Sequence, residues 1–443
     1  MTDVRFARGD HAELAKAVLH ALGPAPLTYD AGEFWRYSPS RGVWEIVPSH
    51  VVRHTAAQFA GAPVGQDEKP LKVNVADVRG AEAIARDELL SQAGRVTFSG
   101  APPGAAFRNG FVVVRDGRID IVPHSEAHRA RHGYPMDYVA WSPGRTPLLN
   151  EFLEGVFADC SEEEAAARTA LLQEFVGACL IGDAVRYQRC LILYGEGGNG
   201  KSAVINLVRS MFPPDALASL PPQRWTERFA LSALEGKLAN FVSETPTGEI
   251  LDGGAFKAVV TGDPVMAERK HRDPFEFRPV AGHMFSTNWP IAASDFSAGF
   301  WRRPMILPFT RRFDTAQERK IAPEARVIER ELSGVVSWAL EGAARLQRQK
   351  QYTMPNQSVV LANEWRDSSD QVRLFLATRP ADEVIQASEF YRQYRTWAGE
   401  NGHKNVLSAH MFGRRVVASK LYERDEDEKA RFYRRVTVGK LLS

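Results

Sequence analysis

The feature that most constrains the fold is a glycine-rich loop between an apolar run and a helical run. The apolar run is Leu191–Tyr194, the loop reads GEGGNGKS over residues 195–202, and the helical run AVINLVRSMF follows. A GxxxxGK[ST] loop in this context binds phosphate, because its glycines let backbone N–H groups turn inward and the helix N-terminus attracts an anion. The sequence therefore predicts a nucleoside triphosphate site in an α/β domain.

The residues of this loop have separate expected roles. Lys201 is expected to reach the β- and γ-phosphates, and Ser202 to place its hydroxyl on Mg²⁺. ATP and Mg²⁺ are therefore the expected ligands. The residues expected to cradle them are Gly195, Gly197, Gly198, Asn199, Gly200, Lys201, Ser202 and Ala203.

Composition and charge exclude several other classes of protein. The 443 residues are 44% hydrophobic and 25% charged, which is ordinary for a globular chain and unlike a disordered, collagen-like or coiled-coil chain. No run of about 18 apolar residues and no basic-then-apolar leader occurs, so neither a membrane span nor a secretion signal is expected. The net charge of +2 does not by itself indicate a nucleic-acid partner. Three cysteines without a C-x-x-C pair fit a reducing compartment, so the bacterial cytoplasm is the expected location.

The pattern along the chain divides it into five segments. Residues 1–142 indicate a mixed α/β region with two hairpins, the clearer of which joins Phe111–Val114 to Ile119–Val122 through an Asp-Gly turn. The other segments are a helical subdomain at 143–186, an ATPase domain at 187–346, a linker at 347–371 and a compact unit at 372–443. Strands alternating with helices indicate the α/β class.

Polar groups beyond the loop are candidates for the chemistry on the nucleotide. Glu244 follows an apolar run, and an acid at a strand end can orient water and help hold the metal, although a surface Glu is the alternative. Asn288 also ends an apolar run and can hydrogen-bond the γ-phosphate, unless Asn-Trp-Pro is only a turn. Arg302 and Arg303 stand between aromatic residues and a proline, where a guanidinium can act on a neighbouring subunit's phosphate.

Together these pieces resemble superfamily 3 helicases, in the phage and plasmid primase–helicase branch related to the poxvirus-type nucleoside triphosphatase. The matching segments occur in the family's order: GEGGNGKS, FVSE, FKAVVTGDPVMAERKHRDPFEFRP, HMFSTNWPI and FWRRPMILPF. The similarity covers most of the chain from about residue 100 onward. It implies an AAA+-type P-loop ATPase core that assembles as a ring, usually a hexamer, with the helical segment 143–186 aiding oligomerisation. Such a ring translocates on single-stranded DNA.

The resemblance also implies a role for each matching residue. These roles are Walker A for Lys201 and Ser202, the Walker B acid for Glu244, sensor 1 for Asn288 and the arginine finger for Arg302 or Arg303. Ser243 precedes Glu244, where many members of the wider superfamily have a second acid. Ser202 and Glu244 are thus the expected metal ligands, and a second carboxylate stays unidentified.

Between the acid and Asn288, the family places a β-hairpin whose tip points into the channel of the ring. Arg269, Lys270, His271 and Arg272 occupy that position, and the Lys-His pair looks like the DNA-gripping pair of related viral helicases. Cations at this position would contact phosphates without reading sequence, and the alternative is a solvated basic turn. Because the N-terminal region contains no D-x-D pair, a helicase without a primase domain is expected, with a primase or an initiator protein as partner.

The C-terminal unit indicates helices followed by a hairpin, which resembles a winged helix. Its second helix carries Arg414 and Arg415, and Lys420 follows, so this basic face is expected to lie on DNA. The alternative is a winged helix that is structural or docks a protein.

The expected function is an ATP-dependent, ring-forming DNA helicase that acts on single-stranded and forked DNA. It would serve the replication of a phage, a plasmid or an integrated mobile element. Two alternatives stay open. One is a P-loop phosphotransferase, which would need a dedicated acceptor pocket, and the other is an ATP-switched DNA-binding initiator or regulator without processive unwinding.

Overall fold

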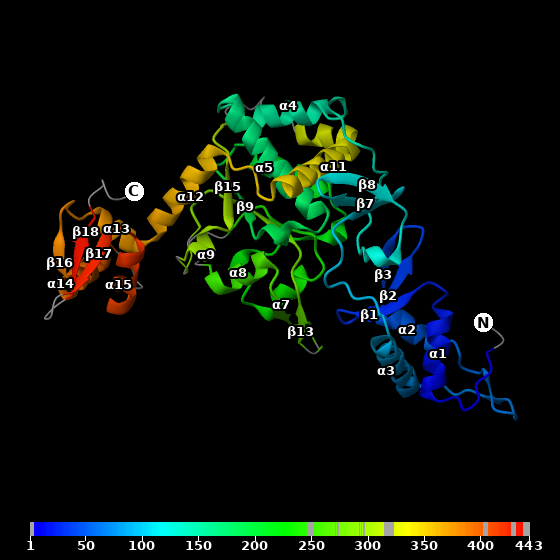
Figure 1. Cartoon of the computed structure of the whole chain (residues 1–443). Coiled ribbons are helices and arrows are strands. Elements are labelled where there is room, and N and C mark those ends of the chain that lie inside the picture. Colours follow the sequence, from blue (N-terminus) through cyan, green and yellow to red (C-terminus); the bar gives the residue numbers. More distant parts are fainter. Residues whose placement is uncertain are drawn as a thin grey trace.

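The computed structural model describes residues 4–245, 251–270, 272, 274–291, 293, 295, 297–313, 323–401, 406–426 and 431–436. Three parts follow one another in space: an N-terminal region, a central α/β body and a small C-terminal unit beyond helix α12 (Asn356–Ser369) (Figure 1). Across these residues, no helix combines the length and the apolar character that a membrane crossing requires.

The N-terminal region is an antiparallel sheet covered by helices. Its elements are α1 (His11–Ala21), β1 (Leu27–Asp30), β2 (Glu33–Ser38), β3 (Val43–Val47), α2 (Ser49–Ala57), β4 (Pro63–Val64), β5 (Lys69–Pro70) and α3 (Val75–Ser91). Phe34 and Val47 pack against the helices, whereas Trp35 and Trp44 pack with Phe98 on the opposite face, because successive strand residues point to opposite sides. Strands β2 and β3 form the other of the two hairpins predicted within residues 1–142, which is thereby confirmed.

A second antiparallel sheet joins the N-terminal region to the body. It consists of β6 (Ala105–Phe107), β7 (Gly110–Arg115) and β8 (Arg118–Val122). Asp116 and Gly117 have φ angles of +51° and +74°, so the predicted Asp-Gly turn is confirmed. Arg348 donates a hydrogen bond to the carbonyl oxygen of Gly117 at 2.6 Å, which fixes this hairpin to the last turn of a helix in the body.

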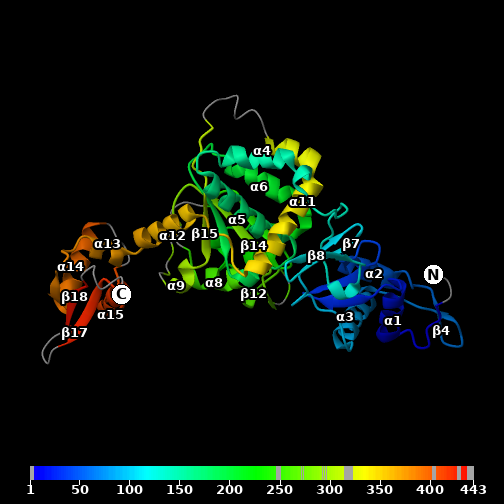
Figure 2. The same ribbon diagram turned by 45° about the horizontal axis from the view of Figure 1, so that its top comes forward.

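Three helices form a layer over one face of the central sheet, and Figures 1 and 2 show them side by side. They are α4 (Pro147–Val156), α5 (Glu162–Leu180) and α11 (Pro323–Gln349). A Cβ atom on Gly177 would lie 2.0 Å from the carbonyl oxygen of Ala339, and one on Gly342 would lie 2.4 Å from that of Gln173. Glycine at both positions therefore lets α5 and α11 approach closely. Both α4 and α5 lie in the segment predicted to be helical.

The core of the body is a five-stranded parallel sheet with the order β10-β11-β14-β9-β15. The strands are β9 (Cys190–Tyr194), β10 (Leu217–Ala218), β11 (Ala239–Val242), β14 (Gly282–Thr287) and β15 (Pro304–Pro308). The four longer strands are almost entirely buried, which explains their continuous apolar runs. The connections that leave the adjacent strands β9 and β14 run in opposite directions across the sheet, towards β10 and towards β15, so a crevice is expected at the carboxyl ends of these two strands. The predicted α/β class is confirmed.

Shorter elements complete the body. Its other helices are α6 (Lys201–Ser210), α7 (Arg228–Leu231), α8 (Gly253–Thr261) and α9 (Ala298–Trp301). Short 3-10 turns lie at Glu126–His128, Pro143–Arg145, Ala184–Tyr187, Pro214–Ala216, Pro222–Arg224 and Ser232–Leu234. A β-hairpin of β12 (Val265–Ala267) and β13 (Phe275–Phe277) forms where the sequence predicts one.

The C-terminal unit packs helices against a three-stranded sheet of order β16-β18-β17. It contains α13 (Gln371–Ala377), β16 (Val384–Gln386), α14 (Ala387–Glu400), α15 (Ala409–Ala418), β17 (Tyr422–Glu426) and β18 (Arg431–Arg435). Phe375, Phe390, Tyr394 and Phe412 form most of its aromatic core.

The segment predicted as a linker, residues 347–371, contains the end of α11 and all of α12. Helix α12 packs on β15, and the ring of Trp365 lies edge-on to Tyr194 with 5.0 Å between centroids. The polar composition of this segment reflects the solvent-facing side of a helix, so α12 is part of the body's surface and not a free connection.

Candidate nucleotide and nucleic-acid sites

The ends of three parallel strands enclose a cavity at the carboxyl edge of the sheet. It has a volume of about 370 Å³ and is lined by the segments that follow β9, β11 and β14. These segments are Gly197–Ala203, Ser243–Thr245 and Ser286–Trp289. The residues that the sequence selects in three separate motifs, Lys201 with Ser202, Glu244, and Asn288, therefore face one cavity.

The glycine-rich loop has a backbone shape that side chains would disturb. Gly195 has a φ of +157°, and a Cβ there would lie 2.1 Å from the carbonyl oxygen of Phe309. Gly198 and Gly200 have φ angles of +78° and +90°, in the region that favours glycine. Asn199 donates from Nδ2 to the carbonyl oxygen of Phe309 at 2.8 Å, which ties the loop to the end of β15. The loop is thus a fixed cradle at the start of α6.

Lys201 is a buried cation whose hydrogen-bond partners are neutral. Lys201 as a whole residue is only 6% exposed to solvent. Its Nζ donates to the carbonyl oxygens of Gly195 and Glu196 at 2.6 and 2.7 Å and to Oδ1 of Asn199 at 3.0 Å. Burial lowers the pKa of Lys201 to about 8, because a charged amine is costly to remove from water. A phosphate in the cavity would supply the negative charge that these partners lack.

The acid and the amide are held at the ends of adjacent strands. Thr245 donates its backbone N–H to the carbonyl oxygen of Ser286 at 3.1 Å, so the chain beyond β11 stays attached to β14. Glu244 and Asn288 are both exposed to the cavity. The side chain of Thr287 brackets the turn that follows, accepting from the backbone N–H of Trp289 and donating to its carbonyl oxygen. This arrangement can place a carboxylate and an amide around a phosphate and an attacking water.

The residues present fit Mg²⁺. Ser202 and Glu244 offer a hydroxyl and a carboxylate oxygen to the cavity, and hard cations prefer oxygen ligands. Mg²⁺ in nucleotide sites takes only one or two protein ligands, with phosphates and waters completing its shell. Two protein oxygens beside a phosphate cradle therefore suffice.

The paired arginines lie at the amino-terminal ends of the strands, opposite the cavity. Pro304 at the start of β15 pairs with Cys190 at the start of β9, whereas the cavity begins beyond the end of β9. A strand of this length spans about 16 Å, so these arginines are far from the chain's own cavity. Arg303 is 6% exposed and donates to Gly299 and to Oγ1 of Thr261.

Arg302, by contrast, is exposed, and one nitrogen donates to Oε1 of Gln188 at 3.0 Å. Its half-buried neighbour Arg189 was missed by the sequence analysis. In the part of the chain that is described, Arg189 has no hydrogen bond or ion pair, and burial followed by the nearby charge of Arg302 lowers its pKa. Only the fold brings these two guanidiniums together, so no local motif could have identified Arg189. They form a cationic pair without a carboxylate partner on the described surface.

The cations of the basic turn differ in whether other residues of the chain bind them. Arg269 and Arg272 are held by the chain's own acceptors, including Glu33 of the N-terminal region. Lys270 is exposed. His271 lies outside the described residues.

The cations of the C-terminal unit also differ, in burial and in their ion-pair partners. Arg415 lies 3.5 Å from Oδ1 of Asp370, and both side chains are mostly buried. Asp370 also caps the start of α13 by accepting from the backbone N–H of Val372. Arg414 and Lys420 are exposed. Arg415 therefore joins α15 to α13, and only Arg414 and Lys420 are presented to solvent.

Comparison with known proteins gives partial matches. Residues 193–303 match a family of unknown function, DUF5906. This stretch begins in β9 and ends at Arg303, so it includes the glycine-rich loop, Glu244, the hairpin and Asn288. The chain is also 25% identical over 173 residues to a putative helicase, L207/L206, of Acanthamoeba polyphaga mimivirus. That match covers 37% of this chain and 17% of the viral protein, so the chain spans about a sixth of that relative.

Solved structures of one protein align along nearly the whole chain. An apo structure of the NrS-1 C-terminal region (305–718) covers 96% of this chain and 100% of its own, with a TM-score of 0.47 and 12% identity. A second apo structure of that region covers 97% and 99%, with the same TM-score and 11% identity.

Proposed function

We propose that the chain is an ATP hydrolase of the superfamily 3, AAA+ type whose cycle moves a DNA strand. The observation that carries this proposal is the convergence of Lys201, Ser202, Glu244 and Asn288 on one cavity, with Arg302 at the opposite edge of the same sheet. A kinase would need a second pocket for an acceptor beside the γ-phosphate. The partial match to a putative viral helicase is consistent with this proposal.

Hydrolysis follows from the positions of these groups. Lys201 holds the β- and γ-phosphates, and the N-terminus of α6 and the backbone N–H groups of the loop bind the same phosphates. Glu244 orients the attacking water and accepts its proton, while Asn288 donates a hydrogen bond to the γ-phosphate. When bound through Ser202 and Glu244, Mg²⁺ supplies neutralisation of the charge that develops on the phosphate oxygens.

The position of Arg302 and Arg189 at the amino-terminal ends of the strands supports assembly as a ring. Arg302 and Arg189 lie about a strand's length from the chain's own nucleotide, so they can act only on the cavity of a neighbouring subunit. A guanidinium brought to the γ-phosphate in this way acts as an arginine finger. Repeating the same contact from subunit to subunit closes a ring, and a hexamer is the size we propose.

DNA would be held at two places. The β12–β13 hairpin would present its basic turn to the phosphates of a single strand, and the C-terminal unit, which has the element order of a winged helix, would bind duplex through Arg414 and Lys420. Forked DNA of a replicating phage, plasmid or integrated element would be the substrate, with a primase or an initiator protein as partner.

Strand displacement on a forked substrate tests this proposal. Wild-type protein with ATP and Mg²⁺ should separate the strands, and negative-stain images with ATP and single-stranded DNA should show closed rings. ATP hydrolysis and DNA binding without strand separation, at an ATPase rate matched to a known helicase, would instead support a switched initiator.

A further inference from the structure

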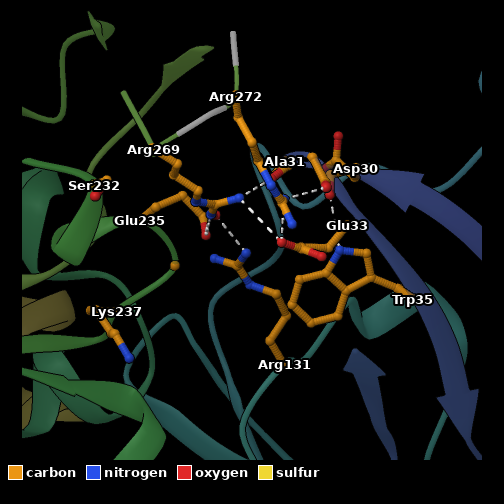
Figure 3. A network of polar contacts seen from close by, with 12 residues as sticks. Asp30, Ala31, Glu33, Trp35, Arg131, Ser232, Glu235, Lys237, Arg269 and Arg272 are labelled. Atoms are coloured by element: carbon orange, nitrogen blue, oxygen red, sulfur yellow. Dashed lines mark hydrogen bonds and ion pairs between the residues drawn. The ribbon is translucent and has the colours of Figure 1, made fainter. Parts of the chain in front are cut away.

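The tip of the β12–β13 hairpin is docked on the N-terminal region (Figure 3). Arg269 donates from Nη1 to the carbonyl oxygen of Ala31 at 2.9 Å, and Arg272 donates to that of Gly32 at 3.0 Å. Both guanidiniums also pair with the carboxylate of Glu33, Arg269 at 3.5 Å and Arg272 through a direct hydrogen bond. Two cations of the predicted DNA-binding turn are therefore engaged by residues more than 200 positions earlier.

A second carboxylate extends this contact into the body. Glu235 lies 3.4 Å from Nη2 of Arg269 and accepts from Nη1 of Arg131 at 2.7 Å. The guanidinium of Arg131 lies over the rings of Trp35 and Phe98, at 5.4 and 5.0 Å from their centroids. The side chains of Glu33 and Glu235 are 18% and 13% exposed, so the pairs are partly shielded from water. The network thus joins the N-terminal region, the body and the hairpin.

The β1–β2 turn has a conformation suited to this contact. Ala31 and Gly32 have φ angles of +51° and +81°. Two successive residues with positive φ make the tight turn of a hairpin. The carboxylate of Asp30, the residue before the turn, accepts a hydrogen bond from the backbone N–H of Phe98 at 2.8 Å, which holds the turn in place. The turn therefore presents two carbonyl oxygens and one carboxylate as a preformed guanidinium site.

The hairpin has short strands, so contacts outside it matter. Its two strands pair over only three residues each, from Val265 with Phe277 to Ala267 with Phe275. An isolated two-stranded hairpin is marginal in water at best, and one this short has few ladder hydrogen bonds. Besides the docked arginines, β12 packs on α7, and the backbone N–H of Glu268 donates to the carbonyl oxygen of Arg228 at 3.1 Å. Lys270 lies between the two docked arginines in sequence, is exposed, and has no hydrogen bond or ion pair to the described residues.

We propose that Glu33 is a positioning residue for nucleic-acid binding. It anchors Arg269 and Arg272 so that the turn projects Lys270 toward the phosphates of a single strand, and the two arginines themselves do not contact phosphate. This inference rests on the proposed function for the DNA contact, but the anchoring can be measured without DNA.

The test uses full-length variants and two readouts. Glu33→Gln and Arg272→Gln remove the anchor, Lys270→Ala removes the exposed cation, and Glu33→Asp keeps the charge. Glu45→Gln is the matched control, because Glu45 lies in the same sheet and pairs with Arg41 on the surface. Hydrogen exchange of residues 265–277 reports anchoring, and binding of an oligothymidine of about 20 nucleotides between low and high salt reports phosphate contacts.

Loss of the Glu33–Arg272 pair should raise hydrogen exchange of the hairpin by about tenfold in Glu33→Gln and in Arg272→Gln. Their double variant should exceed either single variant by less than the product of the two effects, because both single variants break that pair. Oligothymidine affinity should fall several-fold in these variants with an unchanged salt slope. Lys270→Ala should leave exchange unchanged and reduce the salt slope by about 0.7 per contact. Glu33→Asp should stay closer to wild type than Glu33→Gln does, and Glu45→Gln should match wild type.

Three results would overturn the inference while the proposed function stands. Exchange that is unchanged in Glu33→Gln would remove the anchor. A rise in oligothymidine affinity in Glu33→Gln would make the contact a block on DNA binding, and a reduced salt slope in Arg272→Gln would make that arginine a phosphate ligand. Failure of the wild-type protein to bind oligothymidine would overturn the proposed function and the DNA half of this inference together.

Discussion

The candidate nucleotide cavity and the basic turn both contain cations that the sequence assigns to phosphate, but their hydrogen-bond and ion-pair partners differ. Lys201 is buried against two carbonyl oxygens and one amide oxygen, none of which carries a full charge. Arg269 and Arg272 share the carboxylate of Glu33. A cation with neutral partners still gains a full Coulombic interaction from an incoming phosphate, whereas a cation paired with a carboxylate must first give up that pair.

Adjacent arginines that a sequence motif treats alike also differ in their partners. Arg302 and Arg303 are adjacent, yet Arg302 is exposed beside Arg189 and Arg303 is buried against Gly299 and Thr261. Arg414 and Arg415 are adjacent, yet only Arg415 pairs with Asp370. The partner of a cation, more than its place in a motif, should therefore decide whether its loss reduces activity or stability.

The largest effect should come from the arginine at the edge of the sheet. Arg302→Ala should lower the ATPase rate by about 10³-fold or more, as loss of an arginine finger does, while the thermal unfolding temperature changes little. Arg303→Ala should instead lower the unfolding temperature, because it leaves an unfilled, polar site in the body. Steady-state ATPase assays and calorimetry of both variants check the contrast.

Mixing subunits then tests whether Arg302 acts on a neighbour. Rings that combine Arg302→Ala and Lys201→Ala subunits contain some interfaces with an intact loop and an intact finger, so part of the ATPase activity should return. Mixed rings that form and stay inactive would oppose action between subunits.

The next effect concerns the acid and the lysine of the cavity. Glu244→Gln should keep ATP binding and lower hydrolysis by about 10²-fold or more, because the water loses its base. Lys201→Ala should weaken ATP binding itself. Equilibrium binding of a labelled nucleotide, measured beside single-turnover hydrolysis, separates the two, and normal turnover in Glu244→Gln would exclude this residue from the mechanism.

A pH dependence follows from the neutral partners of Lys201. Its pKa is about 8 in the free protein, and a bound phosphate raises that pKa. Below pH 8 the amine is already charged, so this group adds no pH dependence. As pH rises above about 8, ATP binding must take up a proton, and affinity should fall toward tenfold per pH unit. Calorimetry in two buffers of different ionisation heat measures the uptake.

Lys201→Arg is the control for this pH effect, because a guanidinium stays charged throughout the range. ATP affinity in that variant should be flat from about pH 7.5 to 9.5. A wild-type affinity that is equally flat would mean that the amine is not the group that meets the phosphate.

The smallest effect should distinguish the two arginines of α15. Arg415→Gln should lower the stability of the C-terminal unit by about 1 kcal/mol, since the pair with Asp370 is mostly buried but long, at 3.5 Å. Arg414→Gln should leave stability unchanged and weaken duplex binding several-fold. Calorimetry and fluorescence anisotropy with a short duplex measure the two, and equal loss of duplex affinity in both would contradict the distinction.

Local features of the sequence were enough to predict which residues meet at the carboxyl ends of the central strands. The loop, Glu244 and Asn288 each follow a buried strand, and the carboxyl ends of parallel strands meet at one edge, so their convergence follows from the pattern alone. The two hairpins within residues 1–142 were also predictable, the one with the Asp-Gly turn more clearly, because strand alternation and turn residues are local signals.

The features that the sequence did not predict all depend on contacts between distant residues. The close packing of α5 on α11 depends on Gly177 and Gly342, which look like any other helical glycines. Arg189 became a candidate only through its place beside Arg302, and Glu33 only through its contact with the hairpin. Contacts of this kind leave no periodic pattern in the sequence. The sequence therefore could not show which arginines are already bound within the chain and which are free to contact phosphate.

Lys270→Ala combined with His271→Ala shows whether hydrolysis in the cavity moves DNA through the hairpin. Basal ATPase without DNA and unwinding of a forked substrate should be measured on the same preparation. Basal ATPase should survive, because Lys270 is not among the residues that line the cavity, and unwinding should be abolished. Unwinding at the wild-type rate would exclude the hairpin as the moving contact and would make the C-terminal unit the main DNA contact.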